Sequence, residues 1–216
     1  MKKETIRRCA AALLVFSICL LASCSGNNKG GKMTDDQKKQ LYMNVFDTVC
    51  SADEALESAR ASNAVVFEFR GCSSGKDVWN EFYGKVSGGS PATVLCAHYY
   101  VIDSLRMSEE LYEKEKDQYP KLFFYLLEFD GTEFTIKTRL SSEKELDSQQ
   151  KFKYLRHFTG DAPTASALFS AYDYYVLVDD DTVTMEDIRK GYYSSQIGDY
   201  VPNKIVYRDY SGWKEG

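Results

Sequence analysis

The stretch that decides the fold is Ala92 to Ile102, which reads ATVLCAHYYVI. A β-strand places successive side chains on opposite faces of its sheet, and in this stretch mostly apolar residues occupy both sets of alternating positions. A strand with one solvated face would alternate apolar and polar residues instead. The pattern therefore predicts a long interior strand that is covered on both faces.

The sequence before this strand predicts three helices and one short strand. Ser51 and Glu54 have the spacing of a capping box, which starts a helix. Trp79 to Val86 carries aromatic and aliphatic residues at positions i, i+3, i+4 and i+7, which gives an amphipathic helix one apolar face. We expect helices over residues 34–49, 51–60 and 76–86, and a strand over residues 64–70.

The sequence after this strand predicts further strands and one late helix. Asp130-Gly131 lies between two apolar runs and is a strong hairpin signal. Thr184, with Asp187 three residues later, has the spacing that caps a short helix. The charged segment 107–118 is expected to be a solvated helix or loop. Strands are expected over residues 122–129, 133–138, 152–158, 174–178 and 205–207.

Together these elements predict an α+β fold. N-terminal helices are followed by a single, mainly antiparallel sheet of about five or six strands, with one or two packed helices. Residues 34–216 are expected to form one domain.

The N-terminus has the features of an export signal. Four basic residues precede an apolar run from Cys9 to Ala22, which is shorter than the roughly 20 residues that span a bilayer. The run closes on Leu21-Ala22-Ser23-Cys24, which resembles the lipobox of bacterial lipoproteins. That resemblance implies a signal peptide over residues 1–23 and a lipid anchor on Cys24, so that the domain faces the outside of a cell membrane. The polar, glycine-rich residues 24–33 then form a flexible tether.

The charge of the chain argues against a nucleic-acid partner. Residues 1–23 contain four of the 27 basic and one of the 32 acidic residues, so the remainder has a net charge of about −8. Affinity for phosphates comes from clustered Lys and Arg, which an acidic domain lacks. The lipid anchor, rather than attraction to anionic lipids, is expected to hold the protein at the membrane.

Three cysteines remain once the signal peptide and Cys24 are set aside. Cys50 precedes a capped helix and Cys72 follows the strand that returns from it, so a disulfide between them is a hypothesis. Cys96 would then be a buried free thiol. Cys96 and His98 project from the same face of one strand and cannot converge across a cleft, so we expect no catalytic pair there.

Other motifs give no support for an enzyme or a cofactor. The sequence has no Gly-x-Ser-x-Gly turn, no His-Glu-x-x-His motif and no glycine-rich phosphate loop. Asp179, Asp180, Asp181, Glu186 and Asp187 have enough oxygens for calcium, but the EF-hand pattern is absent and a solvated turn is the expected reading. We therefore predict no catalytic residues, no cofactor and no metal.

Tyrosines are the last candidates for function. They either pack within the sheet or form a recognition face for sugars or proteins. The tyrosines concerned are Tyr99, Tyr100, Tyr172, Tyr174, Tyr175, Tyr192, Tyr193, Tyr200, Tyr207 and Tyr210.

Two short motifs resemble a small uncharacterised domain of Gram-positive lipoproteins. They are residues 97–100, which read AHYY, and residues 127–131, which read LEFDG, and the similarity covers about Val65 to Arg139. That domain has no known activity, so the resemblance implies only an α+β sheet and a lipid-anchored protein.

We expect a non-enzymatic binding module for a protein or a cell-wall glycan. The alternatives are an enzyme with an Asp, Glu and Tyr site, such as a glycosidase, and an immunity or inhibitor lipoprotein that docks a basic partner. A deep pocket with paired acidic residues would favour the enzyme, and an aromatic or acidic face would favour binding.

Overall fold

The computed structural model describes residues 33–104, 107–194 and 196–214. The chain divides after Thr34, and every element described below belongs to the part that begins at Asp35. The predicted signal peptide, the predicted lipidation site Cys24 and all but the last residue of the predicted tether lie outside the described residues. Within the described ranges, no helix is both long and apolar enough to cross a membrane.

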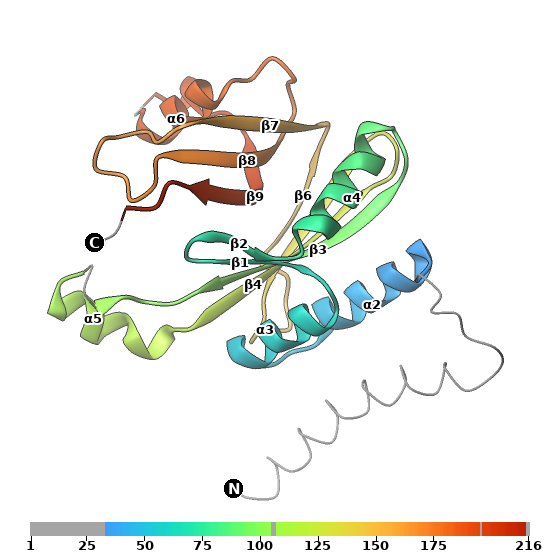
Figure 1. The fold of residues 1–216 in the computed structure, drawn as a ribbon, viewed down its shortest axis with the longest axis horizontal. Coiled ribbons are helices and arrows are strands. Elements are labelled where there is room, and N and C mark those ends of the chain that lie inside the picture. Colours follow the sequence, from blue (N-terminus) through green and yellow to red (C-terminus); the bar gives the residue numbers. More distant parts are fainter. Residues whose placement is uncertain (1–32, 105–106, 195, 215–216) are drawn as a thin grey trace, which may run out of the picture. The chain divides into compact units, whose positions relative to one another are not determined.

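The larger of two sheets has six strands. They are β1 (Val65–Glu68), β2 (Gly71–Ser74), β3 (Ala92–Tyr100), β4 (Lys121–Phe129), β5 (Phe134–Leu140) and β6 (Ser148–Phe152). Their order is β2-β1-β3-β4-β5-β6 (Figure 1), and neighbours pair antiparallel except β1 and β3, which run parallel. The prediction of an interior strand is confirmed, because β3 lies between β1 and β4. The strand ends at Tyr100 rather than Ile102.

Helices cover both faces of β3. The helices of the fold are α2 (Asp35–Asp47), α3 (Ala52–Ala61), α4 (Lys76–Ser87), α5 (Glu109–Glu115) and α6 (Met185–Tyr193). Leu95 and Ala97 belong to a buried cluster with α2 and α3, whereas Val94 and Cys96 belong to a second cluster with α4. Figure 1 shows α4 on the opposite side of the sheet from α2 and α3. The alternating side chains of one strand therefore serve two separate cores.

Two helices begin at the capping residues that the sequence predicts. Ser51 and Glu54 form a complete capping box at α3, and Thr184 and Asp187 form another at α6. The predicted hairpin is also present, since the Asp130 carboxylate accepts hydrogen bonds from backbone N–H groups that follow it in the turn between β4 and β5. The charged segment after β3 contains α5, which has no buried residues.

The prediction of a single sheet is wrong, because the C-terminal strands form a sheet of their own. This second sheet consists of β7 (Tyr154–Asp161), β8 (Ala171–Val178) and β9 (Asn203–Ser211) in the order β7-β8-β9. The strand predicted over residues 152–158 is divided at Lys153, where the chain leaves β6 and enters β7. Figure 1 shows α6 beside this sheet, and a small core joins Ile188 of the helix to Val176 and Val178 of β8.

The two sheets share one hydrophobic core. Trp79 of α4 lies at its centre, with ring centroids 5.1 Å from Tyr175 of β8 and 4.9 Å from Tyr207 of β9. Phe67 of β1 also contacts Tyr207, at 5.3 Å. Because these rings are buried, they hold the second sheet against α4 and β1.

The hypothesis of a Cys50–Cys72 disulfide is corrected by the structure. Cys50, Cys72 and Cys96 are all free. Cys50 packs with the α2–α3 core and Cys72 with the α4 core, which lie on opposite faces of the larger sheet. Cys96 is the completely buried free thiol that the sequence predicts, and burial raises its pKa well above the usual value.

A buried arginine fastens the end of α2 to the sheet. Arg139 of β5 is only 2% exposed, and its Nε donates a hydrogen bond to the Phe46 carbonyl at 2.7 Å. Its Nη2 donates to the Thr48 carbonyl at 2.8 Å, and its Nη1 donates to the carbonyls of Leu140, the last residue of β5, and Ser141. Backbone carbonyls rather than carboxylates therefore satisfy this cation.

Candidate functional site

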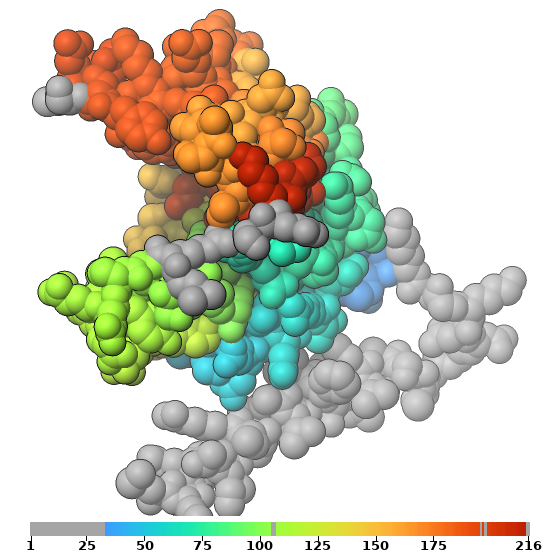
Figure 2. All heavy atoms as spheres, turned by 60° about the vertical axis from the view of Figure 1, so that its left-hand side comes forward, coloured from blue at the N-terminus to red at the C-terminus, as the bar shows by residue number. Residues whose placement is uncertain are grey.

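An aromatic groove of about 300 Å³ is the strongest candidate for a functional site. Among the described residues, four separate segments of the chain build it, and Arg208 is the one lining residue with a charge. Figure 2 views the side of the molecule on which the orange segment around residue 168 lies next to the red C-terminal strand. The lining residues are Phe69, Tyr99, Tyr100, Val101, Leu168, Phe169, Arg208, Tyr210 and Trp213.

The ends of secondary-structure elements position these residues. Phe69 lies in the tight turn between β1 and β2, and Val101 directly follows β3. Gly71 allows β2 to approach β9, because a Cβ atom there would lie 2.9 Å from the Asp209 Cα; its φ of +108° also suits glycine. This close approach brings the β1–β2 turn to the C-terminal end of β9.

Aromatic rings surround Trp213 in the groove. The centroid of its ring lies 5.4 Å from Phe69, 5.8 Å from Tyr210 and 6.0 Å from Phe169. The Arg70 guanidinium lies 5.7 Å from the same ring. Tilted and edge-on contacts of this kind fix the orientation of the rings, so the groove is built before a partner arrives.

Several lining side chains are exposed, although they are large and apolar. Phe69 is 50%, Val101 56% and Leu168 39% exposed. Tyr99 also lies here, with its hydroxyl donating a hydrogen bond to Asp53 at 2.7 Å. Burial and this hydrogen bond raise the pKa of Tyr99 to about 12. Apolar groups gathered on one surface commonly mark a binding site.

Cationic groups of β9 lie at and beside the groove. The Arg208 guanidinium is 5.1 Å from the Tyr100 ring, and the Lys204 ammonium is 4.7 Å from the Tyr125 ring. His98 contacts Tyr125 at 4.3 Å and is almost completely buried. Burial, together with the positive charges of Arg208 and Lys204, holds the pKa of His98 well below its usual value. His98 is therefore neutral near pH 7.

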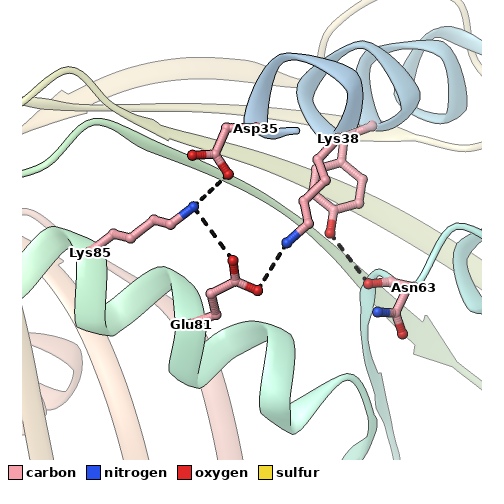
Figure 3. A network of polar contacts seen from close by, with 6 residues as sticks. Asp35, Lys38, Asn63, Glu81 and Lys85 are labelled. Carbon is pink, nitrogen blue, oxygen red and sulfur yellow. Dashed lines mark hydrogen bonds and ion pairs between the residues drawn. The ribbon is translucent and has the colours of Figure 1, made fainter. Parts of the chain in front are cut away.

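A second, larger groove lies between α2 and α4, and its charges form ion pairs. The groove has a volume of about 480 Å³. Figure 3 shows Glu81 of α4 between two lysines, with Lys38 of α2 at 2.9 Å and Lys85 at 3.5 Å, while Lys85 also contacts Asp35 at 2.5 Å. These pairs tie the beginning of α2 to α4.

Glu128, the acidic residue of this second groove that burial affects most, does not match the acid of a glycosidase pair. A glycosidase needs a carboxylic acid with a raised pKa opposite a second carboxylate. Burial alone would raise the pKa of Glu128. The ammonium groups of Lys39 at 2.6 Å and Lys137 at 3.5 Å lower this pKa by more than burial raises it, so the net shift is downward. Glu128 is therefore ionised and paired, which suits a structural role.

Both histidines of the chain stack on aromatic rings. Cys96 and His98 face the same core, where His98 stacks on Phe67 at 4.5 Å. His157 of β7, which the sequence analysis did not single out, lies 2.8 Å from an Asp173 oxygen and stacks on Tyr175 at 4.2 Å. The contacts of His157 are thus a carboxylate and rings, rather than a hydroxyl or thiol nucleophile.

The acidic run near residue 180 is used in local structure. The Asp180 carboxylate accepts hydrogen bonds from the backbone and hydroxyl of Thr182, and the Asp187 carboxylate does the same with Thr184. In the part of the chain that the structure describes, no group of three or more His, Cys, Asp or Glu side chains is arranged to hold a metal ion.

The candidate tyrosines lie in different parts of the structure, and Tyr192, Tyr193 and Tyr200 are exposed outside the groove. Tyr175 and Tyr207 are core residues, and Tyr172 is also buried. Tyr99, Tyr100 and Tyr210 line the groove.

The sequence analysis did not identify the other lining residues. The signal that was available is the mixture of arginine with aromatic residues in Phe69-Arg70 and Tyr207-Arg208. Such a mixture is typical of interfaces.

No known protein family, curated protein or solved structure matches this chain. The resemblance to Gram-positive lipoproteins therefore remains a prediction from the sequence.

Proposed function

We propose that this protein is a lipid-anchored, extracytoplasmic binding module without enzymatic activity, and that the aromatic groove binds a segment of a partner protein. The observation that carries the proposal is the groove itself. It exposes Phe69, Val101 and Leu168 beside a preformed cluster of rings around Trp213.

The composition of the groove supports binding. Trp, Tyr and Arg dominate the energetics of protein interfaces, and apolar neighbours around them exclude water. The groove combines Trp213, Tyr210 and Arg208 with aliphatic Val101 and Leu168. The shared core of the two sheets is complete without these exposed side chains, so stability does not account for their exposure.

A protein segment fits this surface better than a glycan does. A sugar needs several hydrogen-bonding groups around a stacking ring. In the groove, Val101, Leu168, Phe69 and Phe169 offer none, and the Tyr99 hydroxyl already donates to Asp53. The polar side chains of Tyr100, Arg208, Tyr210 and Trp213 remain, so apolar surface exceeds polar surface in the lining. The lining also argues against docking of a basic inhibitor target here, because its charged residue is an arginine.

The lipobox-like Leu21-Ala22-Ser23-Cys24 supports the anchor, and the polar residues that follow support a tether. A tethered domain samples partners within reach of the membrane surface. Lipid chains provide the membrane affinity that an acidic domain cannot obtain from anionic lipids.

Selection from a random peptide library tests the proposed function. The full-length chain, immobilised in detergent, is compared with a Phe69→Ser, Val101→Ser double variant and with Tyr193→Ser, in which a tyrosine that is 90% exposed outside the groove is changed. We expect the wild type and Tyr193→Ser to enrich the same peptides, rich in aromatic and aliphatic residues. The double variant should lose them.

Two results would contradict the proposal. One is the absence of any enriched peptide family, and the other is equal enrichment by the double variant. Binding of purified cell-wall sacculi that is lost in the double variant would replace the protein partner with a glycan.

A further inference from the structure

We infer that the partner segment carries an acidic side chain next to its apolar anchor, and that Arg208 binds this carboxylate. The inference rests on the proposed function, because it names the chemistry of the segment that occupies the aromatic groove.

The first observation is the unsatisfied side chain of Arg208. Its Nε is buried and has no hydrogen-bond partner, and within the described residues it is the one buried nitrogen of a cationic side chain in that condition. A buried donor without a partner is destabilising, and more so when the group is charged. Because the Nε is buried, a ligand reaches this guanidinium through its terminal nitrogens, which are not among the buried atoms without a partner.

The second observation is that no carboxylate balances this charge. Arg208 forms no ion pair with any described residue, and its guanidinium instead lies over the Tyr100 ring at 5.1 Å. A guanidinium on an aromatic face keeps its in-plane N–H groups available. A carboxylate can then accept two parallel hydrogen bonds from the two terminal nitrogens, which is a strong geometry for this pair.

The third observation is that other cationic side chains lie near Arg208. Lys204 lies on the same strand and contacts Tyr125, and Arg70 lies beside Trp213. The carboxyl that acts on Lys204 is that of Asp147, which accepts a hydrogen bond from Thr138 at 3.0 Å. Three cations near one groove favour an anionic group on the partner.

The apolar lining determines what carries that anion. Val101 and Leu168 expose aliphatic side chains, which an aliphatic or aromatic side chain of the partner can cover. A peptide segment supplies both groups when an Asp or Glu lies next to an apolar residue, so the partner is an acidic, apolar protein segment.

The test is a selection of amidated random decapeptides on the full-length chain, on Arg208→Gln and on a matched control, Arg156→Gln. Arg156 is also half-buried and lies 5.6 Å from an aromatic ring, that of Phe158, but outside the groove. We expect peptides selected by the wild type and by Arg156→Gln to contain acidic residues at least about three times as often as the starting library. Arg208→Gln should lose this excess.

The most enriched peptide is then synthesised with its acidic residue intact or changed to Gln or Asn, and its affinity is measured by fluorescence anisotropy. The acidic form should bind the wild type about ten-fold more tightly, since a hydrogen bond to a charged group is worth at least one factor of ten. The difference should disappear in Arg208→Gln, return in part in Arg208→Lys and shrink at high salt.

The outcomes separate the two proposals. Peptides that need the groove but show no acidic excess, or that bind Arg208→Gln equally well, overturn the inference and leave the proposed function standing. Selection of no groove-dependent peptide contradicts both. A denaturation midpoint of Arg208→Gln equal to that of the wild type excludes loss of folding as the cause.

Discussion

The indole ring of Trp79 on α4 stacks on the phenol ring of Tyr207 on β9, with centroids 4.9 Å apart and planes inclined at 28°. This contact joins the first half of the chain to its last strand, and thereby fixes one wall of the aromatic groove. We predict that Trp79→Ala lowers the free energy of unfolding by about 3–5 kcal/mol, as large-to-small changes of buried aromatic residues do. Chemical denaturation measures the loss.

The control for this prediction is Tyr193→Ala, which removes an exposed ring and should change stability by less than about 0.5 kcal/mol. A loss of under about 1 kcal/mol for Trp79→Ala would show that the two sheets do not depend on their shared core.

Arg139 should be essential for stability, although no carboxylate pairs with it. Arg139→Met removes the guanidinium that donates hydrogen bonds to the Phe46 and Thr48 carbonyls. We expect the free energy of unfolding to fall by about 3 kcal/mol or more. Arg139→Lys should recover only part of it, because one ammonium cannot reach every carbonyl that the guanidinium serves. Lys137→Met on the same strand is the control, since its ion pair with Glu128 is partly exposed. Equal stabilities of Arg139→Met and Lys137→Met would refute the role.

His98 should make stability depend on pH. Its pKa is lowered in the folded state by burial and by Arg208 and Lys204, and is about 6.5 when the chain unfolds. The unfolded state therefore binds the proton more readily. The contribution of neutral His98 is fully present above pH 6.5 and is lost as the pH falls below it, by at most about 1.4 kcal/mol per pH unit.

The measurement is chemical denaturation at pH 7.5 and 5.0 for wild type and His98→Gln. The wild type should lose up to about 2 kcal/mol more on acidification than His98→Gln does. NMR of the folded wild type should show the His98 imidazole still neutral at pH 5.5. A protonated imidazole at that pH would contradict the prediction.

Lipidation is predicted at Cys24. Cys24→Ala should move the protein from the membrane fraction to the soluble fraction of fractionated cells, because it removes the residue on which the lipobox-like motif predicts the lipid anchor. Retention of the variant in the membrane fraction, as firm as that of the wild type, would place the anchor elsewhere.

The sequence predicts the centre of the fold through local signals. Apolar residues at both parities of β3 predict an interior strand, the Ser51–Glu54 and Thr184–Asp187 pairs predict helix starts, and Asp130-Gly131 predicts a hairpin. Each of these signals lies within a few residues of the feature that it predicts, and each is confirmed.

Features that depend on distant contacts are not predictable in this way. The chain changes sheet at Lys153, and no glycine or proline stands beside it to mark the change. Arg139 looks like a solvated charge on β5, and only the end of α2, some ninety residues earlier, explains its burial. Cys50 and Cys72 are near each other in sequence, yet a sheet separates them.

The candidate site also depends on contacts between distant parts of the chain. Phe69, Val101, Leu168 and Trp213 come from separate parts of the chain, and the close approach of β2 to β9 brings two of those parts together. The spacing of residues in the sequence does not indicate that these distant segments come together. The tyrosines of the groove could therefore be named as candidates from the sequence, but the groove itself could not be predicted.

Photo-crosslinking in living cells tests the central claim most directly. A benzophenone amino acid replaces Val101 in the groove, or Leu146 as an exposed apolar control outside it. The account predicts a discrete protein adduct from position 101 that Arg208→Gln weakens, and no such adduct from position 146. An adduct that forms equally from both positions, or none from position 101, would contradict the claim that this groove binds a partner protein.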